Sequence, residues 1–277
     1  MVLVLLPVLA LALRPMLSDM RSPSIHSVSS IVKQRVPAPV LMGTAAPSTQ
    51  AKPIAKSEND MYITEFAGSF LLNLAITLGP ASGVSPLPVI ATIILIVMIG
   101  APISGGHYNP NLSLSFHLAG DRTAPNLTKY QVMILGGAFA AQALAHLLTG
   151  TAGPSLMSAT TAAGWAKICA GEFLGSFLSV MVVMYVALIS GPLGGIAAPV
   201  LVGLGFFASI ATFSGLSGSA LNPAVAFGFY AVGRLTNAPK SQLTALFYYV
   251  AAELAGAALA GLATLKIRER LGAIKKA

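Results

Sequence analysis

Two short stretches decide the fold: SGGHYNPN at residues 104–111 and SGSALNPA at residues 217–224. Asparagine is a favoured helix N-cap and proline is favoured at the first helical position, so each Asn-Pro pair predicts the start of a helix. The apolar stretches at 109–118 and 222–232 are too short to cross a bilayer, and each comes directly after a much longer apolar run. Each box therefore predicts a re-entrant half-helix.

The boxes lie within a chain that is strongly apolar. Only 9 % of its 277 residues are charged and the mean hydropathy is +0.80, whereas a soluble domain carries about 25 % charged residues. This composition excludes a disordered chain, a basic nucleic-acid-binding protein and most water-soluble enzymes. It predicts an all-α membrane protein with six transmembrane helices of about 20 residues each. The spans are expected near 61–79, 88–104, 129–149, 167–189, 196–214 and 242–265.

The chain repeats itself along its length. The sequence EFAGSFL from Glu65 returns as EFLGSFL from Glu172, and the first box returns as the second at an offset of 113. A third match pairs Ala141-Gln142 with Ala252-Glu253 at an offset of 111. Each repeat has three spans, an odd number, so the second copy is inverted in the membrane. An inverted 3+3 repeat brings the interrupted segments of both halves together near the midplane.

The net charge of +8 is concentrated at the two ends of the chain. The N-terminal segment starts with an apolar run like a signal-peptide core and continues basic and rich in Ser and Pro, which indicates either organellar targeting or a disordered cytosolic tail. The distribution of Lys and Arg predicts that both ends face the cytosol or its organellar equivalent. The expected division is a targeting or disordered segment at 1–57, a membrane domain at 58–265 with repeats at about 61–150 and 167–265, and a basic tail at 266–277.

The two boxes together predict a polar constriction. Two half-helices that start at one point place two positive dipole ends there. The asparagine amides then donate hydrogen bonds into the lumen, which orients a passing water or hydroxyl and repels a cation. The residues assigned to this pore constriction are Asn109, Pro110, Asn111, Asn222, Pro223 and Ala224.

From these boxes and from the Glu-bearing first and fourth spans, residues 61–265 resemble the major intrinsic proteins, the family of aquaporins and glycerol facilitators. The resemblance implies six membrane helices with two half-helices, one pore per subunit of a homotetramer, and passage of water or small neutral solutes. It also implies residues that support the re-entrant loops. These are Glu65, Glu172, His107 and Gln142.

The sequence departs from the family pattern at the pore. The first box ends in Asn111 where the family usually has Ala, and Val225 stands where the family usually has Arg after the second box. Spacing from the boxes assigns the other filter positions to Val89, Ile210 and Ser219. The four filter residues form an apolar ring with one hydroxyl and no charge, which predicts reduced selectivity for water and passage of bulkier or less polar neutral solutes.

Several classes of function compete with a passive channel. An ion-coupled secondary transporter also has inverted repeats and intramembrane glutamates, here Glu65 and Glu172. A purely structural membrane protein has the same architecture. An enzyme is disfavoured because the sequence has no phosphate loop or nucleophile–base pair. We expect no cofactor, no nucleic acid and no metal, since the histidines show no ligand spacing and Cys169 is the single cysteine. The membrane is organellar (a plastid or another organelle), or else the plasma membrane or an endomembrane.

Overall fold

The computed structural model describes residues 57–79, 86–121, 123–151, 153–191, 193, 195–237 and 242–272. The targeting segment expected at 1–57 lies outside these residues, apart from Ser57, which caps the first described helix. The end of the chain from residue 273 also lies outside them.

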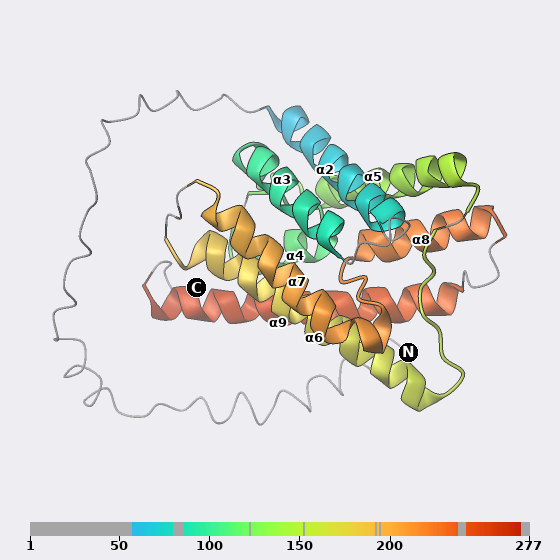
Figure 1. The fold of residues 1–277 in the computed structure, drawn as a ribbon. Coiled ribbons are helices and arrows are strands. Elements are labelled where there is room, and N and C mark those ends of the chain that lie inside the picture. The colour runs from blue at the N-terminus through green and yellow to red at the C-terminus, as the bar shows by residue number, and fades with distance from the viewer. Residues whose placement is uncertain are drawn as a thin grey trace. The chain divides into compact units, whose positions relative to one another are not determined.

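The described residues form six long helices and two short ones (Figure 1). The six long helices are long and apolar enough to cross a membrane, because 18 residues or more extend at least about 27 Å. This confirms the all-α fold with two half-helices. The long helices are α2 (Glu58–Leu78), α3 (Leu87–Ser104), α5 (Leu127–Thr149), α6 (Ala162–Leu188), α7 (Ala197–Ser217) and α9 (Leu243–Arg270). The half-helices are α4 (Pro110–Leu118) and α8 (Pro223–Leu235).

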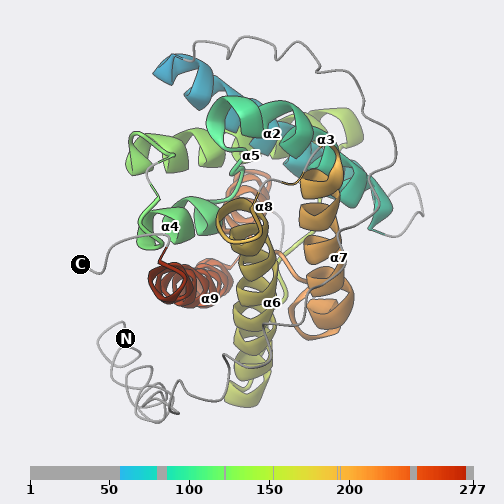
Figure 2. The same cartoon turned by 90° about the vertical axis from the view of Figure 1, so that its left-hand side faces the viewer.

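The helices pack in two matching sets. Helix α2 packs on α3 and α5, and α6 packs on α7 and α9 in the same way. Each half-helix lies against the last span of the opposite set: α8 beside α5, visible in Figure 1, and α4 beside α9, visible in Figure 2. The two halves are therefore interlocked through their half-helices.

Close contacts fix the register of the third span of each half. The Tyr130 hydroxyl donates to the carbonyl of Ser104 at 2.8 Å, and the Tyr249 hydroxyl donates to the carbonyl of Ser217. A Cβ atom at Gly137 or at Gly256 would lie 2.3 Å from a carbonyl oxygen of α2 or α6, so both positions require glycine. Tyr130 and Tyr249 are 119 positions apart in the sequence, and so are Gly137 and Gly256.

This register corrects the third repeat match. An offset of 119 places Gln142 opposite Gly261, and Glu253 opposite Ile134, so Gln142 and Glu253 are not equivalent. The predicted match was wrong because a two-residue match within an alanine-rich helix does not fix how the two helices align. A glycine that lies against a carbonyl of a neighbouring helix fixes this alignment much better.

The last helix is longer than expected. Helix α9 continues through Arg270, so the first residues assigned to the basic tail are helical. The Arg268 Nη1 donates to the carbonyl of Ala119, the C-cap of α4, at 2.7 Å. A cation at this position stabilises the negative end of the α4 dipole. Lys266 pairs with Glu269 at 2.9 Å one turn along the helix. Arg268 and Lys266, which the sequence assigned to a basic tail, thus take part in contacts of the folded domain.

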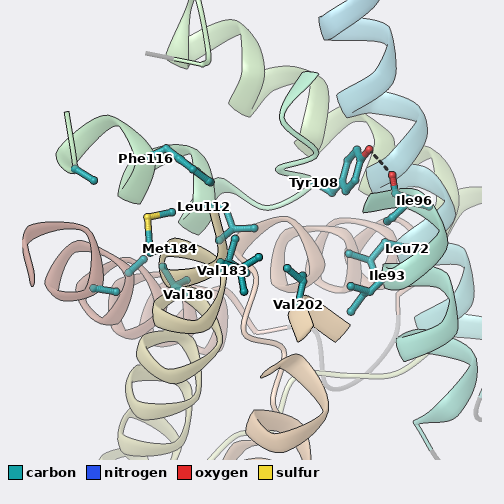
Figure 3. Close-up of a cluster of buried hydrophobic side chains, with 14 of the residues drawn as sticks. Leu72, Ile93, Ile96, Tyr108, Leu112, Phe116, Val180, Val183, Met184 and Val202 are labelled. Carbon is teal, nitrogen blue, oxygen red and sulfur yellow. Dashed lines mark hydrogen bonds between the residues drawn. The ribbon is translucent and has the colours of Figure 1, made fainter. Parts of the chain in front are cut away.

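Apolar side chains face both inward and outward. One buried cluster contains apolar side chains from five different helices, among them Leu72, Ile93, Leu112, Val183 and Val202 (Figure 3). In the same cluster, the Tyr108 hydroxyl donates a hydrogen bond to the carbonyl of Ile96 at 2.9 Å. Many other large apolar side chains lie on the outside, for example Leu147 at 80 % exposure. A surface of this kind fits hydrocarbon rather than water.

We expect the substitution Gly137→Ala to destabilise the protein by about 1–3 kcal/mol, because the added methyl overlaps the Phe66 carbonyl and forces α2 and α5 apart. The measurement is the thermal unfolding of purified protein in detergent. Gly136→Ala is the matched control, because its Cβ would lie 3.5 Å from the nearest atom, an ordinary contact. Equal stability of both variants would contradict the assigned close approach.

Candidate pore and selectivity site

Each Asn-Pro box starts a half-helix as the sequence predicts. Asn109 and Asn222 are extended N-cap residues, and each Oδ1 accepts a hydrogen bond from the backbone N–H two residues later at 2.9 Å. Pro110 and Pro223 occupy the first helical position, where the missing N–H costs nothing. The carbonyl oxygen of each asparagine side chain is thus used for capping, and its amide nitrogen remains as a donor.

The two boxes hold each other through these amide donors. The Asn109 Nδ2 donates to the carbonyl of Leu221 at 3.0 Å, and the Asn222 Nδ2 donates to the carbonyl of Tyr108 at 3.1 Å. Tyr108 and Leu221 have φ values of 51° and 49°, in the left-handed region. This rare conformation accompanies the reciprocal contact in both halves. We call the four residues the clasp; it joins the two halves at the half-helix N-termini.

Asn111 adds two hydrogen bonds that the second half lacks, since Ala224 occupies the corresponding position. Its Nδ2 donates to Ser176 Oγ and to the carbonyl of Leu221, both at 3.2 Å. The Leu221 carbonyl therefore receives two donors, one from Asn109 and one from Asn111, which uses both of its lone pairs. The Asn111 Oδ1 is buried and has no hydrogen-bond partner. The predicted polar departure thus reinforces the clasp on one side.

Buried glutamates hold the loops that lead into the boxes. Glu65 accepts hydrogen bonds from the N–H groups of His107 and Tyr108 at 2.9 and 2.7 Å, and from Ser104 Oγ at 2.6 Å. In the other half, Glu172 accepts from the N–H groups of Ala220 and Leu221 at 3.1 and 2.7 Å. These N–H groups have no helix partner, so each carboxylate satisfies donors that are costly to leave unpaired inside a membrane.

The other two residues expected to support the loops differ in outcome. The His107 Nδ1 lies 3.0 Å from Ser113 Oγ, and its ring stacks on Phe116 of α4, with 4.7 Å between centroids. His107 therefore joins the first loop to its half-helix. Gln142 does not support a loop: neither amide atom has a hydrogen-bond partner, and its Cγ lies against Gly228 of α8. The assignment failed because the third-span register was wrong.

The structure adds a residue whose role the sequence reasoning left unassigned. The Glu253 Oε1 accepts the backbone N–H of Asn222 at 2.9 Å, so this glutamate supports the second box directly. A signal for it exists in the sequence. Tyr249, Glu253 and Gly256 follow one another at helical spacing along one face of α9, as Tyr130, Ile134 and Gly137 do on α5.

The four assigned filter residues line one cavity. Val89, Ile210, Ser219 and Val225 lie in the wall of a cavity of about 560 Å³ that reaches Asn222. The Ser219 hydroxyl is buried and has no partner. Phe206 and Phe229 also line the cavity, although the sequence predicted no aromatic residue there. Phe206 lies four positions before Ile210 on α7, and Phe229 lies four positions after Val225 on α8. This spacing places each phenylalanine on the same helix face as its filter residue.

The described residues contain no group of three or more metal-ligating side chains. The site has three parts. The first is a cavity lined mainly by apolar side chains, and the second is its floor, the amides and carbonyls of the two boxes. The third is the set of buried glutamates that hold the backbone of this floor in place.

Residues 61–263 match the family model of the major intrinsic proteins. The probable aquaporin TIP1-2 of Oryza sativa subsp. japonica is 28 % identical over 177 residues, which cover 61 % of this chain and 70 % of that protein. Aquaporin NIP1-4 of the same plant is 28 % identical over 217 residues, 75 % and 77 % of the two chains. A solved aquaglyceroporin from Plasmodium falciparum shares the fold with a TM-score of 0.62 at 18 % identity, covering 78 % of this chain and 97 % of that one.

The chain belongs to the major intrinsic protein family. It is an integral, multi-pass membrane protein and a channel for water and small solutes rather than an enzyme.

We expect the substitution Asn111→Ala to lower stability by about 1–2 kcal/mol, because the bonds to Ser176 and Leu221 are lost while the Asn109 and Asn222 pair remains. The measurement is thermal unfolding in detergent. Asn109→Ala is the comparison, and we expect a larger loss, since it removes both a helix cap and one arm of the clasp. An Asn111→Ala variant less stable than Asn109→Ala would contradict this ranking.

Proposed function

We propose that this protein is a passive channel whose filter admits small uncharged solutes of the glycerol, urea, ammonia and peroxide class with reduced preference for water. The observation that carries the proposal is the cavity that the four filter positions line: three of them, Val89, Ile210 and Val225, have apolar side chains, and only the fourth, Ser219, has a hydroxyl. A solute with apolar surface loses less on entering such a cavity than one that depends on hydrogen bonds throughout. One of its similar structures is an aquaglyceroporin by name, which supports the same class of solute.

The floor of the cavity supports exclusion of cations. The N-termini of α4 and α8 both lie at the clasp, and their dipoles make this point positive. The side-chain amides of Asn109 and Asn222 point their donors at backbone carbonyls in the same place. Each amide nitrogen has two N–H groups, and the one not used in these bonds is available to the oxygen of a neutral solute, whereas a cation meets the positive ends of two helices.

The contacts of the glutamates argue against coupling to an ion gradient. Glu65 and Glu172 are fully buried, and their oxygens accept hydrogen bonds from the loop N–H groups. A carboxyl that relays a proton must release these donors in each cycle, and the loops would then lose their support. A passive channel requires no such step.

We further propose that the chain assembles as a homotetramer with one pore per subunit, as membership of the family implies. The exposed apolar side chains of the long helices support contacts with lipid and with neighbouring subunits alike. The mass of the detergent-solubilised assembly, measured by light scattering, tests the proposal, and a monomeric mass across a range of detergents would contradict it. Organellar targeting by residues 1–57 remains a prediction.

The test of the filter is a stopped-flow panel on proteoliposomes that compares water with glycerol, urea, ammonia and peroxide. We expect Val225→Arg to lower the permeability to glycerol and urea by about tenfold or more relative to water, because the guanidinium narrows the cavity and adds donors that favour water.

Val225→Met is the control for size, because it adds bulk without charge. We expect it to lower glycerol passage without raising the relative preference for water. If the unsubstituted channel passed water rapidly and excluded all the other solutes, the proposed filter would be wrong. If Val225→Arg left the relative permeabilities unchanged, the constriction would lie elsewhere along the pore.

A further inference from the structure

The second box is supported by two glutamates that hold consecutive backbone N–H groups. Glu172 of α6 and Glu253 of α9 are both fully buried, and they accept the N–H groups of Leu221 and Asn222 at 2.7 and 2.9 Å, which brings the two carboxyl groups close together. Two carboxylates close together and away from water are not both ionised, because their repulsion is not screened. One of the two therefore carries a proton.

The other donors around the pair show which glutamate is ionised. Glu172 accepts the N–H group of Ala220 with Oε1 and that of Leu221 with Oε2. Both of its oxygens therefore have a backbone donor, which favours the ionised form. A protonated Glu172 would point its own O–H at a donor or would lose one of these bonds.

Glu253 has the opposite environment. Its Oε1 accepts one donor, the N–H of Asn222, and its Oε2 accepts none. The nearby Tyr249 hydroxyl does not supply one, because it donates to the carbonyl of Ser217. A buried carboxylate oxygen without a donor is costly, whereas a carboxylic acid has its own proton to give.

We propose that Glu253 is a neutral carboxylic acid that accepts the N–H of Asn222 with Oε1 and donates the proton on Oε2 to the ionised Glu172. It is a positioning residue: it fixes the backbone of the second box and locks it to the carboxylate that holds the second loop. The proton also keeps a second negative charge away from the N-terminus of α8, so the positive potential of the constriction is preserved. The first half has no counterpart, because Ile134 occupies the equivalent position on α5.

The proposal predicts an asymmetry between two conservative substitutions. In Glu253→Gln the amide oxygen accepts from Asn222 and the amide nitrogen donates to Glu172, so both bonds remain. We expect thermal unfolding within about 2 °C of the unsubstituted protein. In Glu172→Gln an NH₂ group replaces one acceptor and faces a loop N–H. We expect the unfolding midpoint to fall by about 5 °C or more.

Infrared spectroscopy of the purified channel reports the proton directly. We expect the carbonyl stretch of a protonated carboxylic acid in the unsubstituted protein and its loss in Glu253→Gln. Glu58→Gln, at an exposed position at the start of α2, is the matched control and should retain the band. Glu253→Leu, which cannot accept from Asn222, should be destabilised as Glu172→Gln is.

Two results would overturn the proposal. The first is a protonated-acid band that is missing from the unsubstituted protein or unchanged in Glu253→Gln. The second is a Glu253→Gln variant that unfolds as early as Glu253→Leu, which would mean that the position requires a negative charge. These readouts do not depend on which solutes pass, so the proposed filter and the shared proton can fail separately.

Discussion

The structure depends on one constraint: backbone N–H groups that lie inside a membrane need partners. Two helices that start near the midplane leave such groups in the loops before them, and no water competes for them in hydrocarbon. Glu65 and Glu172 meet this need with carboxylate oxygens, and the box asparagines meet it with their side-chain oxygens. The pore has a polar floor because the groups that satisfy the helix starts also face one another there.

The two halves solve the same problem with different residues. The first half places an extra amide in its box, Asn111, which bonds across to the Leu221 carbonyl. The second half has Ala224 at that position and instead places an extra carboxyl, Glu253, in its last span. Both additions act on the same short segment around Leu221 and Asn222. The two loops thus share their backbone conformation and differ in the side chains that hold it.

Much of this arrangement can be predicted from the sequence, and the reasons for the failures are physical. The half-helices follow from local capping chemistry at Asn109 and Asn222, and the spans follow from length and hydropathy. The four residues assigned to the filter line one cavity, because their spacing from Asn109 and Asn222 is kept by the loops that precede each half-helix. The role of Glu253 depends on how α9 is aligned with the rest of the fold. This alignment is set by the close contact of Gly256 with a carbonyl of α6. The two segments are far apart in the sequence, so the contact cannot be predicted from local patterns. The length of α9 was missed because a run of basic residues resembles a tail until Arg268 has a partner in α4.

In the proposed function, the low charge of the chain bears on selection among solutes. The lining of the cavity is mainly apolar, with Ser155, Ser217, Ser219 and Tyr249 as its hydroxyl-bearing residues, and it ends at Asn222 of the second box. Water gives up hydrogen bonds in the cavity and gains little in return, whereas apolar surface that leaves water contributes about 25 cal/mol for each Å². A solute with a few carbon atoms and one or two polar groups thus offsets its loss of hydration in the cavity and recovers its hydrogen bonds at the clasp. The proposed selection therefore favours small amphipathic molecules, because an apolar wall is followed by a polar floor.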